Sequence, residues 1–104
     1  SDVYKRQSLA VALLTNLLKN AFVHNIDGGH IRITVTKNSI TFRNSGVENP
    51  LDKEHIFERF YQGTKKEGST GLGLAIADSI CRLQHLSIRY YFEQKEHCFE
   101  ISRQ

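Results

Sequence analysis

The chain has 104 residues, of which 39% are hydrophobic and 24% carry a charge. This size and balance are typical of one globular domain with a single core. The net charge of +3 is too small and too dispersed along the chain to indicate nucleic-acid binding. The longest apolar run is Leu9 to Leu14, far short of the roughly 20 residues that span a bilayer, and no signal peptide is recognisable.

The first seven residues differ in character from the rest. The run Asp2 to Gln7 matches what a common sequencing-transposon adapter encodes when it is translated in frame. We therefore expect residues 1–7 to be an adapter or truncation scar, and we place the domain at residues 8–104, shortened at its N-terminus. Cys81 and Cys98 lack the spacing of a metal site and are expected to be reduced, partly buried thiols.

The first predicted element is a leucine-rich helix over residues 8–24. Asn16, Asn20 and His24 are spaced at i, i+4 and i+8 and therefore share one face of this helix. Amides within so apolar a helix are costly unless they are paired. They either bond to the backbone or offer oxygens to a hard cation such as Mg²⁺.

Two strands and a loop follow a turn at residues 25–29. Apolar and polar residues alternate over residues 30–36, which predicts a strand, and residues 40–43 predict its hairpin partner. A loop over residues 44–50 opens with the run Asn44-Ser45-Gly46. A short helix is then predicted over residues 52–60, with Asp52 or Asn49 as its N-cap.

The polar run from Gln62 to Thr70 is expected to form a mobile, cationic loop that carries Lys65 and Lys66. The run Gly71-Leu72-Gly73-Leu74 then leads into a helix predicted over residues 72–83. Glycine lets the backbone approach a ligand closely, and a helix start presents unpaired N–H groups, so this junction is a candidate seat for phosphate. An ordinary loop-to-helix junction is the alternative interpretation.

The last predicted elements are strands over residues 87–92 and 97–101, joined by a turn at residues 93–96. Together these elements predict an α/β sandwich, in which about three helices cover one face of a mixed, mostly antiparallel sheet.

The order of four motifs gives the chain a resemblance to a known family. The motifs are the asparagine-bearing helix, then Asn44-Ser45-Gly46, then Phe57-Glu58-Arg59-Phe60, and finally Gly71-Leu72-Gly73-Leu74. They resemble the N box, first glycine box, F box and second glycine box of the sensor histidine kinase ATP-binding domain. That domain has the Bergerat fold and shares its superfamily with DNA gyrase and mismatch-repair ATPases. The resemblance covers residues 9–103, and its compact form looks most like kinases of Bacteroidetes-type bacteria.

The resemblance implies a site for ATP and Mg²⁺. Asn20 would be the Mg²⁺ ligand, and Asn20 and Arg59 would be the catalytic residues. Arg59 could instead pair with Glu58 or Glu67, or stabilise the dimerisation helix of the intact kinase. The implied nucleotide contacts are Asn16, Asn20, His24, Asn44, Gly46, Lys65, Lys66, Gly71, Leu72, Gly73 and Leu74.

Several positions depart from the family pattern. Asn16 stands where gyrase-like ATPases carry a glutamate that activates water, and an amide cannot act as a general base, which favours phosphoryl transfer over hydrolysis. Asn44 replaces an aspartate that accepts the adenine amino proton, so the acceptor oxygen remains and the charge is lost. Glu48 replaces the second glycine of the first glycine box, and Val23 replaces a common lysine.

The resemblance implies the catalytic part of a two-component sensor histidine kinase, which donates the γ-phosphate of Mg-ATP to a histidine on a separate dimerisation domain. A response regulator would act downstream, and nucleic acid is not an expected partner. The parent protein would be a membrane-anchored homodimer, with this domain on the cytoplasmic side of the inner membrane. We expect this chain alone to be inactive in phosphotransfer. The alternative is a degenerate, non-catalytic binding module with the same fold.

Overall fold

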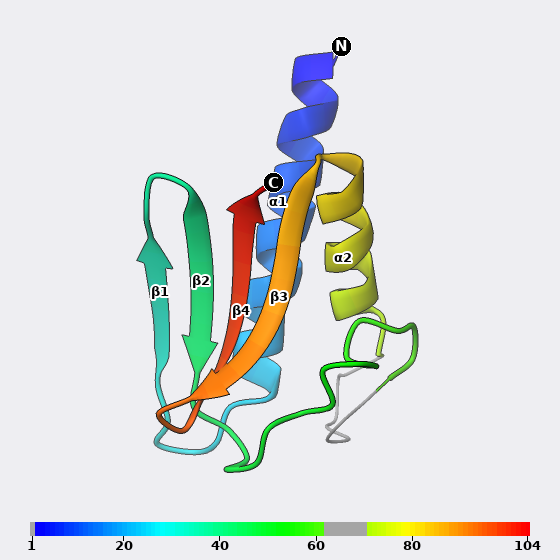
Figure 1. The fold of residues 1–104 in the computed structure, drawn as a ribbon. Coiled ribbons are helices and arrows are strands. Elements are labelled where there is room, and N and C mark those ends of the chain that lie inside the picture. The colour runs from blue at the N-terminus through cyan, green and yellow to red at the C-terminus, as the bar shows by residue number, and fades with distance from the viewer. Residues whose placement is uncertain (1, 62–70) are drawn as a thin grey trace.

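The computed structural model describes residues 2–61 and 71–104. In this part of the chain, a four-stranded antiparallel sheet carries two helices on one face (Figure 1). The elements in chain order are α1 (Asp2–Val23), β1 (Ile31–Val35), β2 (Ser39–Asn44), α2 (Gly73–Leu83), β3 (Leu86–Glu93) and β4 (Glu96–Arg103). The strand order is β1-β2-β4-β3, so the second hairpin joins the first through β4.

The four predicted strands are confirmed, each within about two residues of its expected bounds. The β3–β4 hairpin turns through Gln94 and Lys95, whose φ angles of 52° and 62° are those of a type I′ turn. The expected mixed sheet is not found, because every strand pair among the described residues is antiparallel. The expectation of mixed pairing came with the α/β class, whereas the two hairpins and the β2–β4 pairing leave no parallel neighbours.

Helix α1 begins at Asp2, well before the expected start at residue 8. Residues 2–7 contain no glycine or proline, and Asp2 places an acidic group in the first turn, where it complements the helix dipole. These first turns project beyond the sheet in Figure 1, and their side chains are exposed. Neither helix among the described residues combines the length and apolar content that crossing a bilayer requires.

The helix predicted over residues 52–60 is wrong: these residues form successive turns, so the described chain has two helices. Asp52 acts as a cap, since its Oδ1 accepts the Glu54 N–H at 3.0 Å and its Oδ2 lies 2.6 Å from His55 Nδ1. The turns do not continue as a helix, because Phe60 adopts a positive φ of 66°. A left-handed residue cannot extend a right-handed helix.

The core lies between the sheet and the two helices. Helix α1 contributes one stripe to it, α2 a second, and the inner row of the sheet a third. Phe42, Phe99 and Tyr90 face one another across adjacent strands in this inner row. The buried core residues are Leu13, Leu17, Phe42, Ile56, Ala77, Ile80, Cys81, Tyr90, Phe99 and Ile101.

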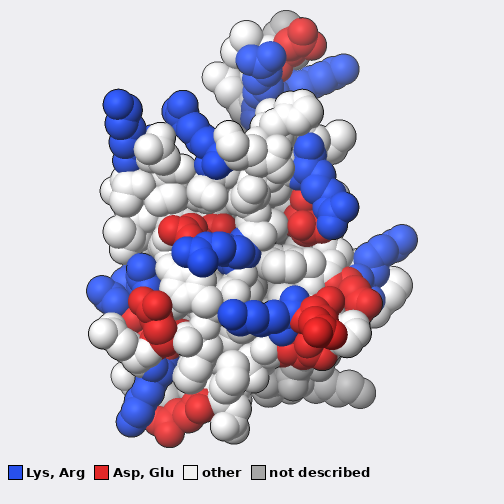
Figure 2. Space-filling model, viewed as in Figure 1, with Lys and Arg blue, Asp and Glu red and all other residues white. Residues whose placement is uncertain are grey.

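The opposite face of the sheet is covered by paired charges. Figure 2 shows positive and negative side chains interspersed over this face. Arg89 Nε lies 2.6 Å from Glu100 Oε1, and Arg43 reaches Glu93 at 3.4 Å. Arg43 also covers Cys98, which is free and buried like Cys81. Burial raises the pKa of Cys81 to about 11, so its thiol stays protonated at neutral pH.

Glu96 joins β4 to β1 across the intervening strand. Arg32 donates to both of its carboxylate oxygens, at 2.6 and 3.0 Å, and His30 Nε2 lies 2.7 Å from Oε2. The Glu96 side chain is only 5% exposed, so it needs these partners. The bonds from Arg32 hold the Glu96 pKa at about 2, although burial acts in the opposite direction.

We expect Glu96→Gln to lower the free energy of unfolding by about 2 kcal/mol at neutral pH, because charge-assisted bonds are lost. The folded pKa is depressed from 4.5 to about 2, so this stabilisation is present above the unfolded pKa and disappears as the pH falls toward the folded one. Urea unfolding across this pH range should show the two proteins converging. The control is Glu100→Gln, whose partner Arg89 is exposed and should contribute little. A difference that stays constant with pH would contradict the prediction.

Gly71→Ala should destabilise the domain more than Gly28→Ala. Both glycines have a φ of 74°, so both substitutions carry the conformational cost of about 1–2 kcal/mol. A Cβ at Gly71 would lie 2.7 Å from the Phe60 backbone, whereas nothing lies within 4 Å of one at Gly28. Thermal unfolding of both variants therefore isolates the cost of the Phe60 contact. Equal losses would show that this close approach contributes nothing.

Candidate nucleotide-binding site

The start of α2 meets the asparagine face of α1. A Cβ at Gly73 would lie 3.2 Å from Asn16 Oδ1, so glycine lets the two helices approach closely here. Asn16 Nδ2 donates to the Ala12 carbonyl at 2.8 Å. Asn16 thus bonds to the helix backbone through its amide nitrogen, as one of the two sequence interpretations expected, and it turns its oxygen toward α2.

Asn20 lies one turn further along the same face of α1 and is half-buried. Its backbone carbonyl accepts the His24 N–H at 3.1 Å. Within residues 2–61 and 71–104, its side chain has no hydrogen-bond partner. The amide oxygen is therefore available as a hard-cation ligand, which is the alternative that the sequence left open for this face.

The second glycine run is tied to the end of the F-box segment. The Phe60 N–H donates to the Gly71 carbonyl at 2.6 Å, and both residues have positive φ angles. Leu72 occupies the N-cap position of α2, and its own side chain makes no cap hydrogen bond. The start of a helix presents backbone N–H groups and a positive dipole end, which suit an anion. Leu74 is half-buried and packs against the core.

The first glycine box contains an unsatisfied buried acceptor. Asn44 is the last residue of β2 and is 2% exposed. Its Nδ2 donates to the Ser45 carbonyl at 2.7 Å, whereas its Oδ1 is buried without a partner among the described residues. Leaving such an acceptor unpaired costs about 1–3 kcal/mol. A ligand that donates a hydrogen bond at this point would recover that cost.

Gly46 joins this loop to the end of α1. A Cβ at Gly46 would lie 3.0 Å from the His24 carbonyl oxygen and 3.0 Å from His97 Cδ2. The structure therefore brings the His24 backbone and Gly46 close together. Ser45 anchors the same loop, because its Oγ accepts the His30 N–H at 2.8 Å and donates to Asn25 Oδ1 at 2.6 Å.

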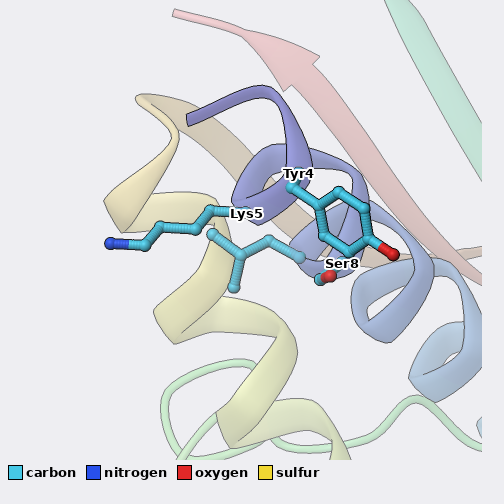
Figure 3. A pocket seen from close by; sticks show the side chains of 4 residues that line it. Tyr4, Lys5 and Ser8 are labelled. Carbon is cyan, nitrogen blue, oxygen red and sulfur yellow. The ribbon is translucent and has the colours of Figure 1, made fainter. Parts of the chain in front are cut away.

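Other predicted residues do not join this arrangement. Arg59 is exposed, and its guanidinium lies over the Phe60 ring, 5.5 Å from the centroid. Lys65 and Lys66, with the whole expected loop from Gln62 to Thr70, lie outside the described residues. A pocket lined by Tyr4, Lys5, Ser8 and Leu9 lies on the exposed first turns of α1 and contains none of the predicted residues (Figure 3).

Sequence reasoning missed His97 and Tyr90. His97 lies under Gly46 and bonds to both the Val47 carbonyl and the Tyr90 hydroxyl. The signal was present in the alternation of β4, where His97 shares its face with Phe99 and Ile101 and therefore points into the core.

The chain matches the family described as histidine kinase-, DNA gyrase B-, and HSP90-like ATPase over residues 6–102. It is 41% identical over 83 residues to the sensor histidine kinase RppB of Synechocystis, covering 71% of this chain and 18% of that protein. It is 39% identical over 89 residues to the heme sensor protein HssS of Staphylococcus aureus, covering 81% of this chain and 20% of that protein. The chain thus spans about a fifth of the length of these relatives. Neither organism supports a Bacteroidetes-type origin.

Two solved structures share the fold. The nucleotide-free catalytic domain of histidine kinase ThkA superposes with a TM-score of 0.74 at 26% identity, covering 90% of this chain and 64% of that one. The mycobacterial sensor histidine kinase MprB superposes with a TM-score of 0.72 at 22% identity, covering 92% of this chain and 74% of that one, which shows the fold alone. The chain therefore belongs to the family of histidine kinase-, DNA gyrase B- and HSP90-like ATPases, and within it is similar to the ATPase domains of sensor histidine kinases.

Proposed function

We propose that this domain binds Mg-ATP and presents the γ-phosphate to a histidine on a separate dimerisation domain of the same kinase. The observation that carries the proposal is Asn44 Oδ1, a buried acceptor without a partner among the described residues. An amide oxygen accepts a hydrogen bond from an exocyclic amino group, such as that of adenine. Because the atom is buried, water does not compete for it, which strengthens the bond.

The phosphates would lie at the other end of the site, where α2 begins. Gly71 and Gly73 allow a close approach to the backbone, and the start of α2 has a positive dipole end that would favour phosphate. Asn20 is the proposed Mg²⁺ ligand, with Asn16 and His24 on the same helix face. Bound there, Mg²⁺ would offset the negative charge of the phosphates.

The residues favour transfer to a protein acceptor. Asn16 cannot take a proton from water, and its amide nitrogen already donates to the Ala12 carbonyl. We also propose that Arg59, Lys65 and Lys66 contact the phosphates.

We further propose a response regulator downstream and a membrane-anchored homodimeric parent that holds this domain on the cytoplasmic side of the inner membrane. The sensor kinases among the relatives support this assignment.

A degenerate, non-catalytic binding module is the second candidate. Glu48 in place of glycine and the neutral amide of Asn44 favour it, since both weaken the usual recognition of adenine. Calorimetric titration with ATP, with and without Mg²⁺, separates the two candidates, and it suits a chain that contains no tryptophan. Mg²⁺-dependent binding supports the kinase domain, and the absence of any binding supports the module.

Asn20→Ala should weaken Mg²⁺-dependent ATP binding by about tenfold or more, because the only proposed metal ligand is removed. The fold should survive, since no described side chain depends on that amide. Calorimetry measures the affinity, and circular dichroism checks the fold. The matched control is Lys19→Ala, an exposed neighbour on another face of α1. Equal Mg-ATP affinity in Asn20→Ala and the parent would exclude this role.

Asn44→Asp should strengthen ATP binding by about fivefold, because a charge-assisted hydrogen bond is roughly twice as strong as a neutral one. The ligand-free variant should be less stable, since the new carboxylate is buried without a partner. Calorimetry and thermal unfolding measure the two effects. Asn38→Asp, in the exposed turn between β1 and β2, is the control. Unchanged affinity would mean that Asn44 does not contact the base.

A further inference from the structure

A series of buried hydrogen bonds lies beneath the first glycine box. His97 Nε2 is 2.6 Å from the Val47 carbonyl oxygen, and His97 Nδ1 is 2.7 Å from the Tyr90 hydroxyl. That hydroxyl also accepts the Leu51 N–H at 2.9 Å. Two side chains from adjacent strands, both at most 5% exposed, thus hold the two ends of the segment from Val47 to Leu51.

The protons in this series have only one consistent arrangement. A carbonyl oxygen can only accept, so His97 Nε2 must carry a proton and donate it to Val47. Burial lowers the pKa of His97, although the bond to Val47 acts in the opposite direction, so the ring is neutral and its Nδ1 is an acceptor. The Tyr90 hydroxyl therefore donates to Nδ1 and accepts from Leu51. Every group is satisfied, which fixes the imidazole tautomer and orientation.

The imidazole ring of His97 lies against the base-binding end of the proposed site. His97 is paired with Asn44 across the β2–β4 ladder. Its Cδ2 would lie 3.0 Å from a Cβ at Gly46, so the ring packs closely against this glycine. Phe92 and Tyr90 hold the ring from the sheet, with centroids 4.7 and 5.9 Å away.

The phosphate-binding end is built from different parts. Gly71 is fixed by Phe60, and Gly73 is fixed against Asn16. Within the described chain, neither His97 nor Tyr90 forms a hydrogen bond with these residues or with Asn20. Substitution of His97 should therefore alter the conformation of the loop that follows Asn44 and leave the glycine run before α2 unaltered.

We propose that His97, oriented by Tyr90, is a positioning residue that shapes the adenine-binding end of the site and so governs affinity for the base. The inference rests on the proposed ATP-binding function. It assigns selectivity to a buried imidazole and tyrosine hydroxyl that would not touch the phosphates. A role in stability alone would change the affinities for all ligands to the same extent.

The test compares the affinities for Mg-ATP and for inorganic tripolyphosphate with Mg²⁺, measured by calorimetry on the parent and on variants. Tyr90→Phe keeps the ring packing and removes the hydroxyl, and it should lower the ratio of ATP to tripolyphosphate affinity about tenfold. His97→Leu should lower the ratio at least as much. His97→Gln should keep most of it, because its amide can donate to Val47 while its carbonyl accepts from Tyr90.

The control variant is Tyr91→Phe, on the neighbouring position of β3, which contacts Arg43 and Arg89 and lies outside the series. It should leave the ratio unchanged. Unfolded molecules bind neither ligand, so the ratio does not depend on the fraction folded, and Tyr90→Phe carries the test if His97→Leu fails to fold. Parallel loss of both affinities, or an unchanged ratio in Tyr90→Phe, would overturn the inference while the parent still binds ATP. A parent that binds no ATP would overturn the proposed function, and this inference with it.

Discussion

The loop that leaves the inner strand β2 carries buried polar groups that need hydrogen-bond partners, and the proposed site depends on how they find them. Buried donors and acceptors are almost always paired, because an unpaired one costs more than a bond contributes. Here Ser45 is satisfied by Asn25 and His30, while Val47 and Leu51 are satisfied through the sheet. Asn44 Oδ1 is the buried side-chain polar atom left over among the described residues. In the proposed site, this one unmet acceptor is the atom that would meet a ligand.

The two ends of the site are built by different physical means. At the end of β2, side chains would form the surface of the proposed site, and buried hydrogen bonds hold the loop around them. At the start of α2, backbone forms it, and glycine is required because neighbouring atoms leave no room for a Cβ at Gly71. Substitutions at the first end should therefore alter selectivity, whereas substitutions at the second should alter stability and phosphate contact together. This division follows from the sequence of the motifs, since polar residues with bonding side chains cluster in one and glycines in the other.

Periodicity made most of the architecture predictable. The apolar stripes of α1 and α2 and the alternation of four strands all appear in the structure. The turns at residues 52–60 were not predictable, because Asp52 caps turns and helices alike, and because Phe60, which has a positive φ, bonds to the distant Gly71. The strand order depends on contacts between distant segments, which local pattern does not contain. His97 was missed because histidine is usually read as a surface or catalytic residue, although its place in the β4 alternation indicates burial.

Glu96 and Asn44 both illustrate that a buried polar group needs a partner, which Glu96 finds within the fold and Asn44 Oδ1 does not find among the described residues. Glu96 is the one acidic side chain that the described residues bury, and it lies within bonding distance of both Arg32 and His30. No described cation bonds to Asn44, and that position carries a neutral amide where the family resemblance would place an aspartate. A carboxylate there would depend on a bound ligand to offset its burial. We therefore expect the amide to favour the stability of the ligand-free fold over the strength with which the proposed site would hold a base.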